Sequence, residues 1–584
     1  MKKITLLIFL FFSFNIIGQT SLQKTWSTYF LKNNSSITKT AIDSEQNIIV
    51  MGQNSLENSE DLNSYSFFTT FNCYQPIPNG GSAESFIAKF NPQGTLLWAT
   101  FFGGELYDFS NKIEIDSENN IYLGTFTLSQ TNIALENSYL VNVSEFTTSS
   151  LGALTKFSSD GNLLWSTYIP GRVQGLKLKN DNEIYIGGYT HNNTNKLSTS
   201  GAYLETALYY NAATWDNLAN GSYTYLMKFD ATGNRIAGTY LDRIYMQSPF
   251  MKIDFDTIGN VITSFSTYNP NSVACSPDSH QPNYGGAGDC FIMKMNANLT
   301  EKIWATYYGG SAEDTNNSIV VSGNDFYVTG YTKSTSGIAT TGAFQENLSG
   351  TNYDGFIAKF SNDGIRQWGT YLGGTDRDYL TDLVIHDDKL YVTGRTQSPN
   401  LATAGAYQAE YIPTYNGTYL DFSGFFAEFT LDGSRNWSSY NNGAPINSIT
   451  FSDFDGFYLS GYTPKTTGIA TAGSWQPNFI LDVTSSSRKY NAFLSRMENL
   501  TLNVSENSIS EARLFPNPAT ATITISNETN IKTIEIFNTL GQSMMTKKVN
   551  DVASEIVVSN FANGIYFVKI KNQEGEKMVK LIKK

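Results

Sequence analysis

The chain is poor in the residues that build most small catalytic and metal sites. Its 584 residues include only three histidines, His191, His280 and His386, and they lie far apart. No His-Glu-x-x-His segment is present, so a zinc site is not expected. No Gly-x-Ser-x-Gly segment occurs and no spacing suggests a Cys–His pair, which excludes the common hydrolase signatures.

Cysteine is equally scarce. Cys73, Cys275 and Cys290 are too few for a disulfide framework. In an oxidising compartment Cys275 and Cys290 are near enough in sequence to pair across a loop, which would leave Cys73 free. The alternative is that all three are unrelated small side chains. Both interpretations stay open at the level of sequence.

Long apolar runs are missing except at the N-terminus. There Met1-Lys2-Lys3 precedes an apolar run from Ile4 to Ile17, which Gly18 follows. Two positive charges before such a run are typical of a secretory signal peptide, and the run is too short to span a bilayer comfortably. We therefore predict a signal peptide over residues 1–18 and an exported protein without a transmembrane segment.

Charge is low and unevenly spread. Charged residues make up 16% of the chain, and the net charge of -13 divides into +2 over residues 1–18, -19 over residues 19–511 and +4 over residues 512–584. An acidic body repels phosphate backbones, so nucleic acid is not expected as a partner. Aromatic residues are 14% and there are 47 glycines, which favours many strands joined by turns.

What the chain does contain is a repeat close to Trp-Ala-Thr-Tyr-Phe-Gly-Gly, about every seventy residues. The Trp of this repeat stands at six positions, and a degenerate copy with Ile236 fills the gap between the third and the fourth. The six are Trp26, Trp98, Trp165, Trp304, Trp368 and Trp437. Around each copy the pattern predicts four short strands separated by turn residues. One such β-rich unit cannot bury its own apolar face, so the copies must pack together.

The phase of the repeat predicts how the fold closes. The chain begins with a fourth strand at Trp26 and its repeats end with a third strand at Phe493–Met497. An orphan fourth strand at one end complements a three-stranded set at the other, as in a closed propeller. We predict an all-β protein with a seven-bladed β-propeller over residues 19–497, whose N-terminal strand closes the last blade. The tryptophans are expected to pack within or between blades.

The connections differ in length. First-to-second and third-to-fourth connections are tight turns rich in Asp, Asn and Gly, such as Asn91-Pro92-Gln93-Gly94. Second-to-third connections run about twenty to thirty-five residues, for example 332–353 and 396–422. They leave the propeller on the same face as the crossovers between blades, and long loops on a rigid scaffold are where binding usually resides.

These segments resemble the bacterial SBBP-type β-propeller repeat. The resemblance is carried by Phe356-Ile357-Ala358-Lys359-Phe360, by Trp368 to Gly374, by Tyr391-Val392-Thr393-Gly394 and by Gly405-Ala406-Tyr407-Gln408. It covers roughly residues 21–500 and departs from the pattern at Ile236 and at Asn441-Asn442-Gly443. It implies a seven-bladed propeller and no common chemistry.

The C-terminal residues have another character. A polar stretch over residues 498–511 is typical of a linker, and the alternating strands of residues 512–584 predict a small Ig-like β-sandwich with a basic tail. The segment resembles the type A C-terminal sorting domain of the type IX secretion system of Bacteroidota. The residues that carry this resemblance, and would form the sorting signal, are Pro516, Asn517, Pro518, Gly541, Gln542, Gly564, Ile565, Tyr566 and Lys580. It implies recognition by the secretion machinery and a secreted or cell-surface protein that has passed through the periplasm.

Candidate binding residues come from the crossovers and the long loops. Acidic residues of the crossovers are expected near the propeller axis, where they would be solvated turn residues or would hold a calcium ion or a polar ligand: Glu105, Asp108, Asp242, Glu313, Asp314, Asp376 and Asp378. Trp215, Tyr407 and Trp475 of the long loops suit stacking on sugars or docking to a protein, or else packing among the loops.

The sequence therefore favours a non-enzymatic exported propeller that binds an extracellular glycan or protein through its long-loop face. A polysaccharide hydrolase or lyase and a structural adhesin without a small ligand are the alternatives. No cofactor is expected, with calcium the one candidate ion.

Overall fold

The computed structural model describes most of the chain. The described residues are 21–32, 34–56, 62–146, 151–207, 222–244, 251–268, 275–412, 414–415, 420–441, 443–453, 456–480, 489–500, 512–538, 542–572 and 576–584. Their regular elements are β-strands and one short 3-10 helix, η1 (Leu62–Tyr65). The chain divides into two compact units, Met1–Asn499 and Leu500–Lys584.

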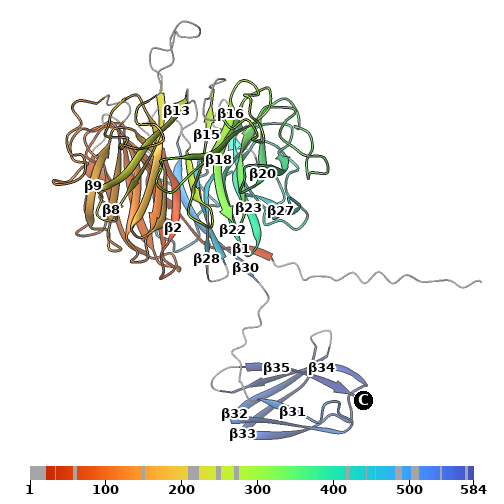
Figure 1. The fold of residues 1–584 in the computed structure, drawn as a ribbon. Coiled ribbons are helices and arrows are strands. Elements are labelled where there is room, and N and C mark those ends of the chain that lie inside the picture. Colours follow the sequence, from red (N-terminus) through yellow and green to blue (C-terminus); the bar gives the residue numbers. More distant parts are fainter. Residues whose placement is uncertain are drawn as a thin grey trace, which may run out of the picture. The chain divides into compact units, whose positions relative to one another are not determined.

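The first unit consists of seven antiparallel four-stranded sheets, which we call blades A to G (Figure 1). Blade A contains β2 (Ser35–Ile42), β3 (Ile48–Ser55), β4 (Ala83–Phe90) and β5 (Leu96–Phe102). Blade B contains β6 (Asp108–Ile115), β7 (Ile121–Thr127), β8 (Leu151–Phe157) and β9 (Leu163–Ile169). Blade C contains β10 (Arg172–Asn180), β11 (Glu183–Thr190), β12 (Ser222–Phe229) and β13 (Arg235–Ile244). Blade D contains β14 (Lys252–Phe255), β15 (Val261–Thr267), β16 (Asp289–Met295) and β17 (Lys302–Tyr308). Blade E contains β18 (Asp314–Ser322), β19 (Asp325–Thr332), β20 (Asp354–Ser361) and β21 (Arg366–Leu372). Blade F contains β22 (Asp378–His386), β23 (Lys389–Thr396), β26 (Ser423–Thr430) and β27 (Arg435–Asn441), with a small hairpin of β24 (Thr414–Tyr415) and β25 (Leu420–Asp421) in its long loop.

Blade G shows how the ring closes. It contains β28 (Ile446–Ser452), β29 (Gly456–Thr463) and β30 (Asn491–Leu500), and its fourth strand is β1 (Ser21–Phe30) from the other end of the chain. The first strands contact one another in a closed circuit that runs β2, β6, β10, β14, β18, β22, β28 and back to β2. This confirms the seven-bladed propeller whose N-terminal strand completes the last blade. β30 extends to Leu500, three residues into the stretch predicted to be a linker.

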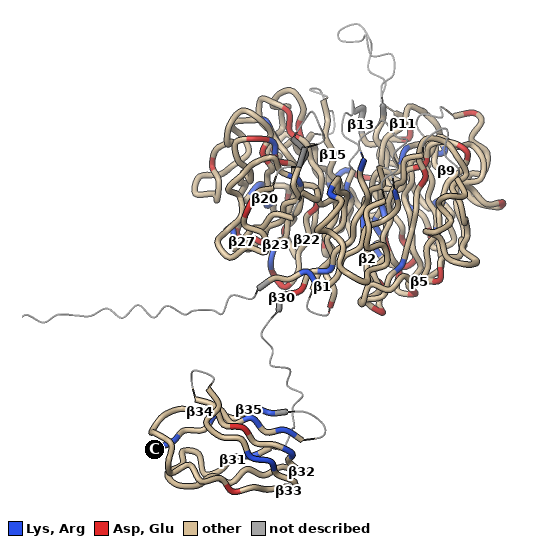
Figure 2. Tube along the Cα trace, turned by 180° about the vertical axis from the view of Figure 1, so that it is seen from behind, with Lys and Arg blue, Asp and Glu red and all other residues tan. Residues whose placement is uncertain are grey.

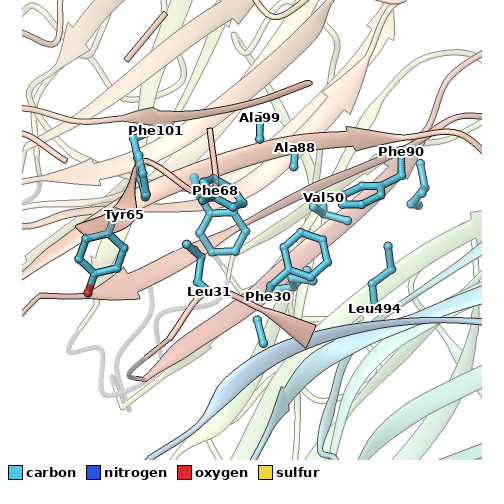
Figure 3. Packing of buried hydrophobic residues seen from close by; sticks show 14 of the residues in the cluster. Phe30, Leu31, Val50, Tyr65, Phe68, Ala88, Phe90, Ala99, Phe101 and Leu494 are labelled. Carbon is cyan, nitrogen blue, oxygen red and sulfur yellow. The ribbon is translucent and has the colours of Figure 1, made fainter. Parts of the chain in front are cut away.

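A buried aromatic cluster joins the closing blade to blade A. Phe30, Phe68, Phe86 and Phe101 are fully buried in it, together with aliphatic residues from both blades (Figure 3). Phe30 and Phe86 stack with ring centroids 6.2 Å apart. Because burial of large aromatic side chains is a main favourable contribution to folding, this cluster stabilises the seam between the two ends of the propeller chain.

The repeated tryptophans join neighbouring blades. Trp98 lies on β5, the outer strand of blade A. Its indole N–H donates a hydrogen bond to Ser159 O in the third-to-fourth turn of blade B, at 3.0 Å. Gly161 in that turn has a φ of 81°, and a Cβ there would lie 2.8 Å from the Trp98 ring. The turn therefore requires glycine twice, for its backbone and for the ring that covers it. The same indole-to-turn bond recurs for Trp26, Trp165, Trp304 and Trp368.

The degenerate copy changes both partners together. The register corrects the expected position: Ala237, not the half-exposed Ile236, stands at the tryptophan position of blade C, because it pairs with Lys228 as Trp304 pairs with Lys294. The facing turn of blade D has Leu299 in place of Gly. Leu299 is fully buried at a φ of 60°, a conformation that β-carbon-bearing residues rarely adopt. The leucine side chain replaces apolar volume at this boundary, so the tryptophans and turn glycines act as pairs, as the predicted packing role requires.

The second unit is a small β-sandwich, as predicted. Its strands are β31 (Arg513–Phe515), β32 (Thr522–Asn538), β33 (Ser543–Val557), β34 (Gly564–Lys571) and β35 (Glu576–Lys583). The long strand β32 pairs with β31 and β33 near its start and with β33 and β34 near its end, so the sheet folds over on itself. Alternate residues such as Ile523, Ile525, Ile534 and Ile536 fill the core.

All three cysteines are unpaired. Cys290 is buried in β16, and the sulfur of Cys275 lies 3.5 Å from Gln281 O. The structure therefore contains no Cys275–Cys290 disulfide and agrees with the interpretation of three unrelated small side chains.

Candidate functional site at the long-loop end of the propeller

The connections between second and third strands all leave one end of the propeller, which we call the long-loop end. They include residues 128–150, 333–353 and 464–490, whereas the turns at the opposite end span about five residues, such as 91–95. Antiparallel strand order within each blade places the crossovers between blades at the long-loop end as well. The one-sided distribution of loops is thus as predicted.

The Thr of each repeat anchors a long loop to the fourth strand. Thr100 Oγ1 accepts a hydrogen bond from Gln75 N at 2.9 Å, and Thr306 accepts one from Gln281 N at the same distance. The equivalent bond is present in all seven blades, through Thr28, Thr100, Thr167, Thr239, Thr306, Thr370 and Ser439. The loops therefore start from a fixed base rather than hanging from two strand ends.

Three of the predicted acids have a common structural role. Asp314 is buried, and its carboxylate accepts hydrogen bonds from Gly310 N at 2.7 Å, from Ser334 Oγ at 2.8 Å and from the hydroxyl of Thr332. Asp108 and Asp378 make the same three contacts in their own blades. Each carboxylate ties a crossover to the start of a long loop, so its oxygens are engaged within the fold.

A second buried carboxyl group lies beside each of these three. Asp289 and Asp354 begin the preceding third strands, and Glu84 holds the matching place in β4. A Cβ on Gly309 would lie 2.6 Å from Asp289 Oδ1 and 2.7 Å from Asp314 Oδ2, which is why the repeat has glycine there. We call these groups the carboxyl pairs: Glu84 with Asp108, Asp289 with Asp314, and Asp354 with Asp378.

Burial shifts the carboxyl pairs toward their protonated forms. It raises the pKa of Asp289 to about 7 and that of Asp314 to about 6, and repulsion between the two acids adds to the shift of Asp289. Asp354 and Asp378 follow with values of about 7 and about 6. Burial, with the charge of Asp108, raises the pKa of Glu84 to about 9. Each pair is expected to hold a proton near neutral pH.

The remaining predicted acids are more accessible. Glu105 accepts hydrogen bonds from Gln130 N and Thr131 Oγ1, and Asp376 is exposed. Glu313 accepts a hydrogen bond from Tyr353 Oη at 2.7 Å. The side chain of Asp242 and all of Trp215 lie outside the described residues. Within the described part of the chain, no three His, Cys, Asp or Glu side chains gather closely enough to hold a metal ion.

The predicted aromatic residues of the loops pack inward. Trp475 lies against Phe30 and Phe68, with ring centroids 5.4 and 5.9 Å apart. Tyr407 packs against the core of blades F and G, and burial raises its pKa. Their geometry gives both a packing role, whereas their role in binding stays a prediction.

A different aromatic group forms at the inner edge of the long-loop end. We call it the tyrosine cluster; it contains Tyr331, Tyr353, Tyr379, Arg395 and Phe422, all half-buried. Tyr379 is the centre, with ring centroids 4.7 Å from Tyr331 and 5.6 Å from Tyr353. The Arg395 guanidinium lies 5.0 Å from the Tyr379 centroid and 5.0 Å from that of Phe422. Glu313 adds a carboxylate through Tyr353.

A smaller counterpart lies on blades B and C. The guanidinium of Arg172 is 3.7 Å from the centroid of Phe126 and 5.2 Å from that of Tyr189. Tyr107 packs on Phe126, and His191 packs on Tyr189. Aromatic faces next to guanidinium groups and half open to solvent are the chemistry that stacks on planar or sugar-like ligands.

A sequence signal for the tyrosine cluster does exist. Second strands end in Gly-Tyr-Thr at Gly188–Thr190, Gly330–Thr332 and Gly461–Thr463, and in Gly-Arg-Thr at Gly394–Thr396. The residue after the glycine is the penultimate residue of its strand and therefore lies at the long-loop end of the blade. The periodic position was visible, but only the blade order shows that these residues meet.

In the C-terminal unit, the sorting-signal residues combine structural and exposed positions. Asn517 donates to Lys580 O at 2.6 Å and accepts from Ile582 N, which fixes the Pro516–Pro518 segment to β35. Gln542 N donates to Asn538 Oδ1, and Gly541 lies outside the described residues. Tyr566 is buried and donates to Ala562 O, whereas Ile565 and Lys580 are exposed. Lys and Arg residues line the strands of this unit (Figure 2).

Comparison with known proteins decides the role of this unit. Residues 513–584 match the family described as Secretion system C-terminal sorting domain. The C-terminal unit is a secretion sorting domain. This confirms the expectation of type IX sorting and a secreted or cell-surface location. No helix among the described residues is long and apolar enough to cross a membrane.

A relative of this chain shares low sequence identity with it. An uncharacterized WD repeat-containing protein of Acanthamoeba polyphaga mimivirus is 25% identical over 315 residues, which are 47% of this chain and 22% of that protein. The chain therefore matches about a fifth of that relative's length.

Three solved structures illustrate the structural comparison. A protein of unknown function from Dyadobacter fermentans has 8% identity over 81% of this chain and 99% of its own, with a TM-score of 0.33. The Pyrococcus horikoshii acylaminoacyl peptidase has 10% identity over 85% and 58%, with a TM-score of 0.35. PorZ, a surface component of the type IX secretion system of Porphyromonas gingivalis, has 11% identity over 94% and 81%, with a TM-score of 0.20. The assignment of a propeller rests on the strand pairing within the seven blades.

Proposed function

We propose that this protein is an exported binding protein, built on SBBP-type repeats, whose long-loop end takes an extracellular glycan. The observation that carries the proposal is the tyrosine cluster. Three tyrosines, a phenylalanine and an arginine stand half-buried together on a rigid inner edge, with Glu313 beside them. Aromatic faces pack on the C–H faces of sugar rings, and the guanidinium and carboxylate suit their hydroxyl groups.

The sorting domain is proposed to deliver the propeller by contacting the type IX secretion machinery, after a signal peptide has directed the chain to the periplasm. Neither a catalytic group nor a cofactor enters this function. A polysaccharide hydrolase or lyase is the alternative, and turnover of a bound glycan that is lost in Asp376→Asn or Asp314→Asn would favour it over simple binding.

Glycan arrays with the chain from residue 19 to 584, with and without calcium, test the proposal. A retained glycan should bind the Tyr379→Ala variant roughly tenfold more weakly, because truncating a central aromatic contact typically costs at least about 1.4 kcal/mol. Tyr566→Phe, in the other unit, is the matched control and should bind as the parent does. Unchanged affinity in Tyr379→Ala, or no retained glycan with or without calcium, would overturn the proposal.

A protein ligand is favoured by one other observation. Phe71 is 94% exposed, and Phe67, Tyr74 and Leu106 are also exposed on the loop and crossover of blade A. Exposed apolar side chains grouped on one loop are typical of protein contact sites. Pull-downs in which the Phe71→Ser variant loses a protein partner that the Tyr379→Ala variant retains would assign protein binding to this loop. Lost attachment to the cell surface in the Phe71→Ser variant, with no small ligand bound, would indicate a structural adhesin.

A further inference from the structure

A cavity of about 100 Å³ lies where the long loop of blade B meets blade C. Three parts of the chain line it: the loop segment 135–139, Leu164 and Trp165 on β9, and the turn 232–234 that joins β12 to β13. β9 is the outermost strand of blade B, so the cavity belongs to the outer wall of the propeller. The tyrosine cluster belongs to blades E and F, so the two features are separate.

The loop that forms one wall of the cavity is fixed to both blades. Leu135 N donates a hydrogen bond to Ser166 O on β9 at 3.0 Å. Farther along the loop, the ring of Tyr139 packs against Phe229 of blade C with centroids 5.7 Å apart, and its hydroxyl donates to Lys196 O at 2.6 Å. The segment between these anchors is held in place by the fold, which lowers the entropy that a ligand must remove on binding.

The opposite wall is a turn that Trp165 holds in place. The indole N–H donates to Ala231 O at 3.0 Å. Gly233 in this turn has a φ of 83°, and a Cβ there would lie 3.0 Å from the Trp165 ring. Asn234 follows in the turn, and its amide nitrogen donates to Thr232 Oγ1 at 2.8 Å. An apolar ring and a carboxamide therefore stand side by side in this wall.

The loop of blade B departs from the repeat at the positions that line the cavity. Leu135-Glu136-Asn137-Ser138 takes the place of Thr-Ser-Gly-Ala, Thr-Thr-Gly-Ala, Thr-Ala-Gly-Ala and Thr-Ala-Gly-Ser in blades C, E, F and G, at residues 199–202, 340–343, 403–406 and 471–474. In all five loops the first of these residues donates from its backbone N to the fourth strand. Asn137 keeps the positive φ of the glycine, at 67°. The backbone is thus that of the repeat, while the carboxylate and the carboxamide are additions.

Ser138 contributes a hydroxyl group without a partner. Its Oγ is buried and makes no hydrogen bond within the described part of the chain. Such a hydroxyl costs stability, and a ligand oxygen that reaches it removes this cost. Ser474 holds the same place in blade G and its Oγ also has no partner among the described residues, but Ala472 and Gly473 precede it there. Of the five loops, that of blade B alone joins such a hydroxyl to a carboxylate and a carboxamide.

We propose that this cavity binds one edge of a sugar ring, through a hydroxymethyl group or two neighbouring hydroxyl groups. The carboxylate of Glu136 accepts hydrogen bonds, and the side chains of Asn137 and Ser138 both donate and accept, which is what sugar hydroxyl groups require. Trp165 and the exposed Leu164 offer apolar surface to the C–H groups of the ring. The volume equals that of about three water molecules, so one edge of the ring enters and the remainder stays in solvent.

The charge of the cavity argues against an inorganic ion as its ligand. Of the described residues that line it, only Glu136 is charged, and its carboxylate would repel an oxyanion. A metal ion would find this single carboxylate, whereas Ca²⁺ in proteins is usually held by several carboxylate and carbonyl oxygens. The site does not depend on the tyrosine cluster, so each of the two can be disproved without the other.

Saturation-transfer NMR and calorimetric titration of the chain from residue 19 to 584 test the site. The probes are the methyl glycosides of glucose, galactose, mannose, fucose and N-acetylglucosamine. We expect saturable binding of at least one of them in the millimolar range, because only one edge of the ring is enclosed. Binding should persist in Tyr379→Ala, which separates this site from the tyrosine cluster. No saturable binding of any of the five glycosides, or binding that Tyr379→Ala abolishes, would overturn the proposal.

Variants that restore the repeat separate a binding role from a structural one. Glu136→Gln should weaken binding about tenfold, as expected for the loss of a hydrogen bond to a charged group. Asn137→Gly should weaken binding at least about threefold without lowering Tm, because glycine is the usual residue at a positive φ. The triple variant Leu135→Thr/Glu136→Ala/Asn137→Gly has the loop sequence of blade F and should lose measurable binding.

Ser474→Ala, at the equivalent place in blade G, is the matched control for Ser138→Ala. Removal of either hydroxyl should leave Tm unchanged or raise it, whereas only Ser138→Ala should weaken binding, by about threefold. Unchanged affinity in the triple variant would place the ligand elsewhere, and an equal loss of affinity in Ser474→Ala would reveal a general effect; with either result the proposal is wrong. If the triple variant fails to fold, Asn137→Gly decides, and unchanged affinity in that variant contradicts the assigned site.

Discussion

The carboxyl pairs and the lysines that line the cavity at the propeller axis, Lys39, Lys112, Lys177 and Lys252, are ionisable groups enclosed by the same propeller, yet the fold treats them differently. Each carboxyl pair recurs in several blades and is held by hydroxyl and backbone donors of its own crossover. Lys39, Lys112 and Lys252 stand at positions where other blades have Gly175, Ser318 or Asp382. The repeated acids therefore stabilise the crossovers in the same way, whereas the charge around the axis differs from blade to blade.

The largest expected effect is on pH dependence. The folded-state pKa values of Asp289 and Asp354, about 7, and of Glu84, about 9, lie above the ordinary 3.8 to 4.5 of these acids. Between those values the folded state binds more protons than the unfolded state, so stability falls as pH rises. Each raised pKa adds a slope of up to about 1.4 kcal/mol per pH unit to the free energy of unfolding. The stability that each group contributes is present in full at low pH, below the ordinary pKa of the acid. It is lost as pH rises through the folded-state value, about 7 for Asp289 and Asp354 and about 9 for Glu84.

Urea unfolding followed by tryptophan fluorescence measures this slope in the propeller alone, because all eight tryptophans precede residue 500. The midpoint should fall between pH 5 and pH 8. Asp289→Asn should flatten the curve, whereas Asp376→Asn, at an exposed position, should not. A midpoint that rises with pH would show that the pairs are ionised in the folded state.

The next effect is that of removing a repeated carboxylate. Asp314→Ala leaves the donors of Gly310, Thr332 and Ser334 without their acceptor, which should cost about 3 kcal/mol of the free energy of unfolding. Asp376→Ala should stay within about 0.5 kcal/mol, since its side chain is exposed. Equal losses in the two variants would contradict the structural role assigned to Asp314.

Much of this fold was predictable because the repeat carries both a period and a phase. Trp26 and Phe493–Met497 predicted the closing blade, and the structure pairs β1 with β30. Strand starts were predicted less well: β6 begins at Asp108, which was expected in a crossover, because the polar residues at its start are buried rather than exposed.

The candidate sites were far less predictable. The acids Asp108, Asp314 and Asp378 stood out in the sequence, yet their partners Glu84, Asp289 and Asp354 come from a strand in the preceding blade. Lys112 and Lys252 are 140 positions apart in the chain and line the same axial cavity only because blades B, C and D are neighbours around a closed ring. One repeat supplies one residue to such a ring, so its charge balance appears only after the strand registers are known.

A smaller effect concerns the anchors of the long loops. Thr306→Val removes the hydroxyl that accepts from Gln281 N and should cost about 1 kcal/mol, because one buried backbone donor loses its acceptor. Protection of the Gln281 amide from hydrogen exchange should drop while the amides of β17 stay protected. Thr232→Val, in an exposed turn, is the matched control. Loss of protection throughout blade D would indicate general destabilisation rather than a released loop.

The smallest effect tests whether a departure from the repeat is itself a matched pair. Leu299→Gly restores the usual turn residue but removes a fully buried side chain, so it should destabilise the propeller by about 1 to 2 kcal/mol despite the relief of a positive φ. Ala237→Trp alone should also destabilise, because Leu299 occupies the space of the indole. The double variant should recover roughly 1 kcal/mol relative to the sum of the single changes, as Trp98 over Gly161 does naturally. Additive losses would mean that Ala237 and Leu299 are independent, and that the blade C–D boundary is held by other contacts than those that join the remaining blades.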